Sequence, residues 1–136
     1  MTECPRSILV AVDFGEASAR AVAVEGALAA HCGATLRLLH AERFEAPPYF
    51  TPEQIETLEA EQHTIRNRVE QALTEFGRQH TPHAFTAVVD DRSPTDAILN
   101  AATGSDLVVM GTHGRRGVRA CERPMLFVPE VSPGGR

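Results

Sequence analysis

The segment Asp106–Gly117 constrains the fold more strongly than any other part of this chain. Its first half, Leu107–Met110, is a continuous apolar run of the kind that is buried on both faces of a parallel sheet. Gly111, Gly114 and Gly117 follow, and they let the backbone turn sharply and approach a ligand closely. Open α/β sheets bind nucleotides at such turns after a parallel strand. The segment therefore predicts a parallel α/β fold with a ligand site at this turn.

Strand and helix patterns alternate along the whole chain. Besides residues 106–110, apolar runs predict strands at 8–13, 35–41, 84–90 and 125–128. Amphipathic stretches predict helices at 16–32, at 52–76, and from Ser93–Pro94 to just before Gly104. This order predicts an α/β protein with a single-domain, doubly wound parallel sheet of five strands and right-handed crossovers. We expect the domain to span residues 1–131 and residues 132–136 to form a flexible tail.

The first helix is bounded by two glycines. Gly15 can serve as its N-cap, and Gly33 is expected to stop it. Helical spacing predicts a core-facing side that contains Ala17, Ala21, Val24 and Leu28.

The long helix at residues 52–76 begins with a capping box, in which Thr51 is the cap, Pro52 the first helical residue and Gln54 the third. Its apolar residues recur at alternating steps of three and four, interrupted only by Gln62. Over many heptads this pattern is typical of a coiled coil, whereas over so few it favours packing against a sheet. The apolar positions are Ile55, Leu58, Ile65, Val69, Ala72 and Phe76.

Charge is distributed unevenly. The net charge is −5, and all 13 basic residues are arginine. Residues 111–123 carry four arginines against Glu122, a net charge of +3, so the rest of the chain carries −8. A small basic area on an acidic protein suits a phosphate-bearing small molecule and argues against nucleic acid. The absence of lysine excludes P-loop and Schiff-base chemistry, because both need its amine.

Cysteine spacing and hydropathy indicate the expected compartment. Cys4, Cys32 and Cys121 show neither CxxC nor zinc-finger spacing, which predicts reduced thiols and no bound metal. No apolar run reaches the ~18 residues of a membrane span, and no apolar leader opens the chain. We therefore expect a soluble cytoplasmic protein that has no membrane partner.

Four segments carry a resemblance to a known family. They are Ile8–Asp13, Leu38–His40, Ser93–Pro94 with Ile98, and Asp106–Arg115, the last being the most specific. With these segments the chain resembles the universal stress protein family from end to end. The resemblance implies a Rossmann-like fold of the adenine nucleotide α-hydrolase type, with strand order 3-2-1-4-5. Many members bind ATP, and most form homodimers through the last strand, here Met125, Leu126, Phe127 and Val128.

The resemblance also implies where the base and ribose of a nucleotide would lie. Asp13 matches the family aspartate near the ribose, and Ala11 and Val12 lead into it. Ala41, after the second strand, stands where the family holds adenine through backbone groups. A polar strand end that caps its own turn is the alternative interpretation of Asp13.

The phosphate motif of the family, Gly-x2-Gly-x9-Gly-Ser/Thr, is matched only in its first half. Gly111 and Gly114 fit the first pair, and Arg115 supplies a neighbouring cation. Pro124 and Met125 stand where glycine and serine or threonine are expected. The family helix that precedes the last strand also has too few residues here, which removes its N-terminus from the phosphates. The resemblance therefore implies an incomplete triphosphate clamp.

This short connection leaves the pairing of the last strand open. A parallel crossover usually takes a dozen or more residues and a helix. Residues 125–128 could pair parallel or antiparallel, pack loosely, or add to the sheet of a partner subunit.

Two functions of different classes remain. The first is a non-catalytic stress-response protein that binds ATP or AMP, with Mg²⁺ only alongside ATP. The second is a nucleotide-free regulatory or dimerisation module with an unidentified protein partner. No catalytic motif or metal-ligand set is recognisable in the sequence, so we expect neither catalytic residues nor a resident metal.

Overall fold

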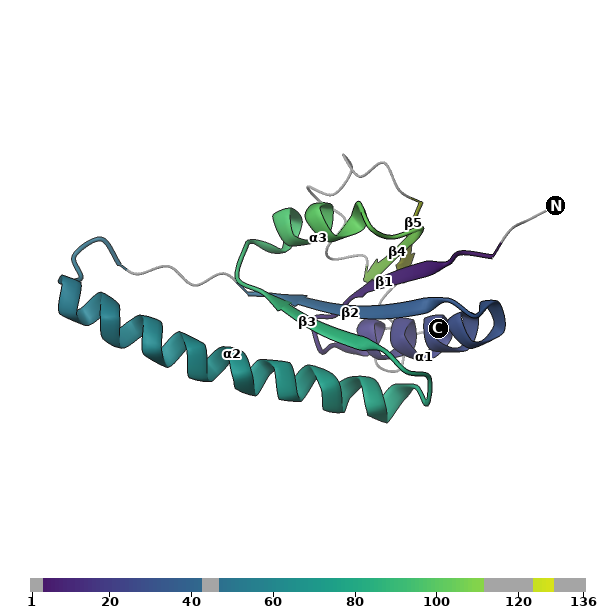
Figure 1. Ribbon diagram of the computed structural model, residues 1–136, viewed down its shortest axis with the longest axis horizontal. Coiled ribbons are helices and arrows are strands. Elements are labelled where there is room, and N and C mark those ends of the chain that lie inside the picture. The colour runs from purple at the N-terminus through teal and green to yellow at the C-terminus, as the bar shows by residue number, and fades with distance from the viewer. Residues whose placement is uncertain (1–3, 43–46, 112–123, 129–136) are drawn as a thin grey trace, which may run out of the picture.

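The computed structural model describes residues 4–42, 47–111 and 124–128 of the chain (Figure 1). In these residues one sheet contains β1 (Ser7–Ala11), β2 (Thr35–Ala41), β3 (Thr86–Asp90), β4 (Leu107–Gly111) and β5 (Met125–Val128). The helices are α1 (Glu16–Cys32), α2 (Pro52–His80) and α3 (Pro94–Ala102). The strand order is β3-β2-β1-β4-β5, which confirms the predicted α/β fold and its topology.

All pairs of neighbouring strands run parallel. The last strand is included, because Val108 is aligned with Met125 and Gly111 with Val128. Parallel pairing within the chain is therefore the observed alternative for residues 125–128. The expected loss of the preceding helix falls on residues 112–123, which lie outside the described part of the chain.

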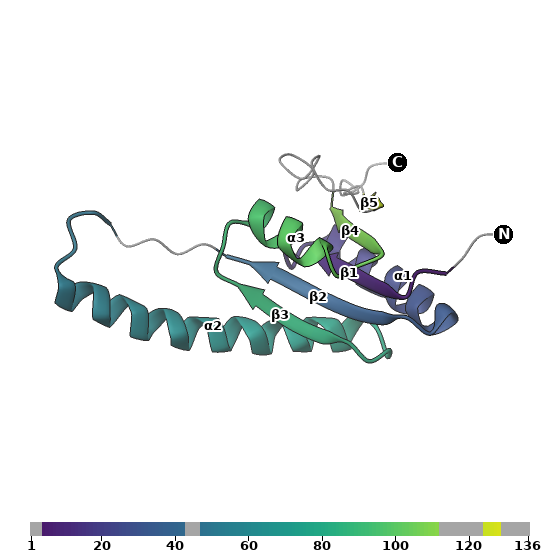
Figure 2. The ribbon, with the colours of Figure 1, turned by 45° about the horizontal axis from the view of Figure 1, so that its top comes forward.

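Helices cover both faces of the sheet, with α1 and α2 on one side and α3 on the other (Figures 1 and 2). The core is accordingly divided into two clusters. Ile8 and Val10 of β1 contribute to the cluster under α1 and α2, and Leu9 contributes to the cluster under α3. Successive side chains of a strand point to opposite faces, so a strand that is apolar at every position is needed here.

Helix α1 has the predicted bounds and a partly different buried face. Gly33 ends it in the left-handed conformation, with φ of 67°. The expectation for Val24 is wrong, because its side chain is 60% exposed. Val22 and Glu25 are buried instead. The run of residues 21–24 is apolar on several sides of the helix, so periodicity alone could not choose the face.

Helix α2 begins with the predicted capping box and extends to His80, four residues past the predicted end. Its C-terminal half packs closely on the sheet at Gly77, where an added Cβ would lie 2.7 Å from Leu38 Cδ1. Leu73 and Gly77 are its only buried residues in the described structure. The N-terminal half extends well beyond the sheet (Figure 1). Packing against the sheet therefore accounts for only part of the predicted apolar stripe.

A disulfide joins Cys4 to Cys32, so the expectation of reduced thiols is wrong for these two residues. Their Cα atoms lie 5.5 Å apart although 28 positions separate them in the sequence. The chain enters β1 beside the point where α1 ends, and this return brings the two cysteines together. Cys121 lies outside the described residues. Among the described helices, none is long and apolar enough to cross a membrane.

Glu25 is the buried carboxyl group of α1, with only 2% of its surface exposed. Its Oε1 atom has no hydrogen-bond partner among the described residues. Desolvation by this burial raises the pKa of Glu25 above its ordinary value. The folded protein therefore holds this proton more tightly than the unfolded chain does.

We expect Glu25→Gln to become increasingly more stable than the parent as the pH rises. The raised pKa means that the stability contributed by protonated Glu25 is fully present below the unfolded-state pKa and is lost as the pH rises through the folded-state pKa. Urea unfolding of both proteins from acid to alkaline pH measures this difference. Equal pH dependence of the two free energies of unfolding would contradict it, and Glu56→Gln on exposed α2 is the matched control.

Candidate functional site

A cavity of about 120 Å³ lies at the carboxyl ends of β1, β2 and β4, beside the N-terminal half of α3. Whole drug-sized ligands usually occupy roughly 300–1,000 Å³, so this cavity has room for one part of such a ligand. Its walls are mainly apolar. The lining residues are Ala11, Val12, Asp13, Leu39, His40, Ala41, Pro94, Ile98, Met110 and Gly111.

The topology of the sheet explains the position of this cavity. From β1 the chain crosses through α1 on one face, whereas from β3 it crosses through α3 on the other face to reach β4. The connections on the two sides of β1 and β4 therefore diverge and leave a gap above the ends of these strands. This switch point is where open α/β sheets bind ligands.

Asp13 follows β1 and is held in place by the turn into α1. Its Oδ1 atom accepts hydrogen bonds from Gly15 N at 2.8 Å and from Ser18 Oγ at 2.7 Å. Ser18 Oγ also accepts from Asp13 N at 2.9 Å, and Ser18 is buried. These bonds fix an exposed carboxylate in one orientation at the edge of the cavity. The capping interpretation and the ligand interpretation of Asp13 are thus compatible.

Phe14 adopts a left-handed backbone conformation in the same turn, with φ of 64°. This conformation is unfavourable for a bulky residue, and such strain is concentrated at functional sites. The ring of Phe14 lies 4.8 Å from the ring of His40 and 5.4 Å from that of Phe76. These contacts tie the strained turn to β2 and α2.

His40 lies near the carboxyl end of β2. Its side chain is 14% exposed, and Nδ1 lies 2.7 Å from the carbonyl oxygen of Val12. The contact joins the ends of β1 and β2, both of which line the cavity.

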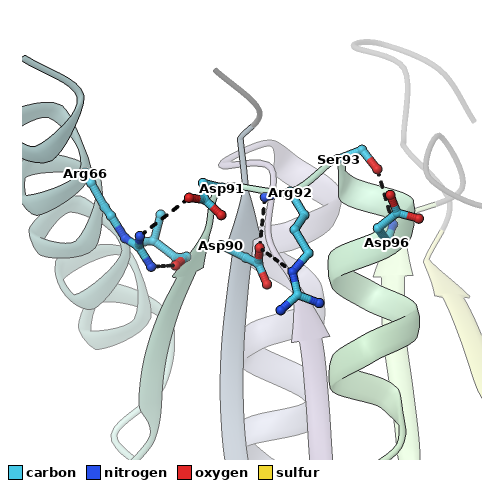
Figure 3. Close-up of polar contacts among 7 residues, drawn as sticks. Arg66, Asp90, Asp91, Arg92, Ser93 and Asp96 are labelled. Carbon is cyan, nitrogen blue, oxygen red and sulfur yellow. Dashed lines mark hydrogen bonds and ion pairs between the residues drawn. The ribbon is translucent and has the colours of Figure 1, made fainter. Parts of the chain in front are cut away.

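Polar contacts fix the loop between β3 and α3, which leads into Pro94, a lining residue of the cavity (Figure 3). Arg92 donates from its backbone N to Asp90 Oδ1 at 2.9 Å, and its Nε lies 3.5 Å from the same oxygen. On α2, Arg66 donates to the carbonyl oxygen of Val89 at 2.8 Å and lies 4.0 Å from Asp91. Ser93 then caps α3.

The two neighbouring aspartates at the end of β3 contact different arginines, Asp90 with Arg92 and Asp91 with Arg66. The described residues contain no group of three or more metal-ligating side chains.

The structure brings five predicted site residues together around the cavity, namely Ala11, Val12, Asp13, Ala41 and Gly111. Gly114 and Arg115 lie outside the described residues. The ligand-binding role of all seven remains a prediction. Sequence reasoning missed the role of five further lining residues. These are Leu39, His40, Pro94, Ile98 and Met110.

Two features of the sequence could have pointed to these missed lining residues. Pro94 and Ile98 open the helix that precedes the glycine turn, and Met110 immediately precedes Gly111. Both signals point to the switch point only after the strand order is known.

Comparison with known proteins identifies one family. The universal stress protein family model matches residues 5–121. Similar solved structures include a universal stress protein family member from Burkholderia pseudomallei, with 24% identity, a TM-score of 0.57, and coverage of 96% of this chain and 100% of that one. A universal stress protein from Archaeoglobus fulgidus in complex with dAMP shares 18% identity, with a TM-score of 0.59 and coverage of 90% and 96%.

A further similar structure is a universal stress protein in complex with cAMP, with 19% identity and a TM-score of 0.61. The alignment covers 93% of this chain and 98% of that one. At these identities the structural likeness establishes the fold. No curated protein sequence matches the chain.

We expect Ser18→Ala to lower the free energy of unfolding by about 1–2 kcal/mol, because it leaves the Asp13 backbone N–H and carboxylate without their buried hydroxyl partner. Urea denaturation measures the loss. Thr64→Ala is the matched control, since that hydroxyl is exposed and donates to the Ala60 carbonyl of its own helix, its one hydrogen bond among the described residues. Equal stabilities of the two variants would contradict the proposed role of Ser18.

Proposed function

The chain belongs to the universal stress protein family, and from this premise we propose that it is a non-catalytic stress-response protein that binds an adenine nucleotide. The ligand is AMP or ATP, and Mg²⁺ enters only with ATP. One observation carries the proposal: Ala11, Val12, Asp13, Ala41 and Gly111 surround a cavity at the switch point of the sheet. The dAMP and cAMP bound by similar structures support it.

The cavity suits the base and ribose half of such a ligand. Ile98 and Met110 provide apolar walls against which a planar base can pack, and Ala41 offers backbone groups at the end of β2. Asp13 stands at the edge of the cavity with its carboxylate already oriented, so it can accept from ribose hydroxyl groups without a large ordering cost.

The phosphate half of the site is weaker. Phosphates would extend past Gly111 toward Gly114 and Arg115. Pro124 stands where the family motif has the glycine of the second half of the clamp, and proline has no N–H to donate to a phosphate. Its carbonyl oxygen accepts a hydrogen bond from Val108 N at 2.9 Å. We therefore propose that ATP and AMP bind with similar strength, because the β- and γ-phosphates add few contacts.

A nucleotide-free regulatory module is the second candidate, and Pro124–Met125 is the observation that favours it. In this case the protein acts by binding other proteins: the exposed edge at β5 forms a homodimer, and the rest of the surface binds a regulatory partner. We propose the homodimer edge for both candidates, because β5 lies at the end of the sheet and Leu126 is 46% exposed.

Isothermal titration of the nucleotide-stripped protein with AMP and with ATP, each with and without Mg²⁺, tests the first candidate. We expect micromolar binding of both nucleotides at similar strength. Ala41→Leu should abolish this binding, because the larger side chain fills the cavity beside β2. Ala60→Leu on the exposed surface of α2 is the matched control and should bind normally. Absence of heat with the parent protein would instead support the nucleotide-free module.

The homodimer edge is tested by Leu126→Lys. A lysine on an edge strand opposes strand-to-strand pairing, so sedimentation velocity should show an assembly of half the parent mass. Leu126 is preferable to Phe127, which packs against the core of its own subunit. Val24→Lys, a substitution of another exposed apolar residue on α1, is the control. An unchanged mass for Leu126→Lys would place the interface elsewhere.

A further inference from the structure

The N-terminal half of α2 has an apolar face that contributes to neither core cluster of the described structure. This half extends past the carboxyl edge of the sheet (Figures 1 and 2). In the other half Leu73 belongs to the core, and Val69 and Phe76 are partly buried against it. Ile55 and Ile65 belong to neither core cluster. The side chain of Ile65 is 38% exposed. Packing within the subunit therefore does not explain why the apolar stripe continues to the start of the helix.

The stripe, as we define it, has seven members at alternating steps of three and four residues. They are Ile55, Leu58, Gln62, Ile65, Val69, Ala72 and Phe76. Alternating steps of this kind are the seam of a two-helix coiled coil, in which the first and fourth positions of each heptad meet the partner. Ala72, within the half that packs on the sheet, is also exposed. A second helix can therefore contact the stripe beyond its solvent-exposed half.

We propose that the stripe of one subunit pairs antiparallel with the stripe of a second copy of this chain. In the proposed register Ile55 meets Ala72 of the partner subunit, and Leu58 meets Val69 of the partner subunit. Gln62 then meets Ile65 of the partner subunit, and the twofold axis passes between positions 63 and 64. The two Gln62 amides fall in adjacent layers about this axis, where polar residues can help to specify register.

Charge at the flanking positions selects this register. In an antiparallel pair, residues that flank the seam on the same side face one another across the interface. Glu61 then lies beside Arg68 of the partner subunit. The twofold axis repeats this contact, which gives two pairs of opposite charge.

Shifts by one heptad lose this complementarity. A shift in one direction brings the two copies of Glu61 together, and a shift in the other brings the two copies of Arg68 together. Each shift replaces attraction by repulsion between like charges. A parallel pair would bring Glu61 beside Arg66 of the partner subunit instead and would leave Arg68 without an acidic partner.

Glu61 and Arg68 are the best residues for a test. Both are exposed, and neither has an ion-pair partner in the described part of the chain. Arg66 is less suitable, because it already contacts Val89 and Asp91 of its own subunit. Glu56 and Arg78 are exposed on the same helix but outside the stripe and its flanks, so they serve as matched controls.

The experiment is sedimentation equilibrium of the full chain, with and without Leu126→Lys, so that association through the β5 edge is separated from association through α2. Glu61→Arg alone and Arg68→Glu alone should each raise the dissociation constant of self-association about tenfold. The double variant and an equimolar mixture of the two single variants should both return it to the parent value, because each restores opposite charges across the interface. Glu56→Arg and Arg78→Glu should leave it unchanged. Circular dichroism of each variant checks that α2 remains helical.

Three results would overturn the proposal. The first is a parent protein that stays monomeric at millimolar concentration. The second is self-association that Leu126→Lys abolishes while Glu61→Arg and Arg68→Glu leave it unchanged. The third is a loss in the single variants that neither the double variant nor the mixture restores.

Discussion

The central position of β1 is the constraint on which the rest of the structure depends. Ile8, Leu9 and Val10 are at most 1% exposed, because helices cover both faces of the strand and β2 and β4 cover both of its edges. A strand enclosed in this way must be apolar at every position, and polar residues can appear only where it ends. Asp13 is the first charged residue after the end of β1, so it lies at the edge of the sheet where the carboxyl ends of all five parallel strands meet. One property of the first strand therefore determines both the core and the place of the cavity.

Sequence patterns predicted the alternation of strands and helices, the bounds of α1 and the capping box of α2, because each depends on local periodicity or on one capping residue. The strand order was implied by the family resemblance and not by these patterns. They failed where tertiary contacts decide. Val24 is exposed because the orientation of α1 is fixed by its contacts with the sheet, and the pairing of Cys4 with Cys32 depends on where α1 ends relative to β1. The same division applies to the site. Asp13 follows one apolar strand and Gly111 ends another, so both positions could be recognised, whereas Pro94 reaches the cavity only through a crossover on the other face.

Helix α2 serves two environments along its length. Near Gly77 it approaches the sheet so closely that Leu38 and Phe85 occupy the space of a side chain, and this contact fixes its direction. Its other half continues in that direction past the sheet. Between the two halves, Arg66 of α2 donates to the carbonyl oxygen of Val89 near the end of β3 (Figure 3). The close packing of one half thus determines where the free half extends. The aromatic contacts from Phe14 through Phe76 to His80 connect this helix to the turn at Asp13.

The Cys4–Cys32 disulfide has a consequence for the dynamics of the sheet. It closes the β1–α1 unit into a covalent loop. By restricting the conformational entropy of the unfolded chain, the cross-link stabilises the folded state by about 3–4 kcal/mol. In the oxidised protein, local opening cannot separate these two elements, whereas β4 and β5 have no such cross-link in the described structure. Amide hydrogen exchange should therefore be slowest along β1 and faster at the β5 edge. The cross-link holds the amino end of β1, whereas the cavity lies at the carboxyl ends of β1, β2 and β4, where strand pairing and packing join the elements. A molecule bound in the cavity would therefore act as a second, reversible link at the opposite edge of the sheet.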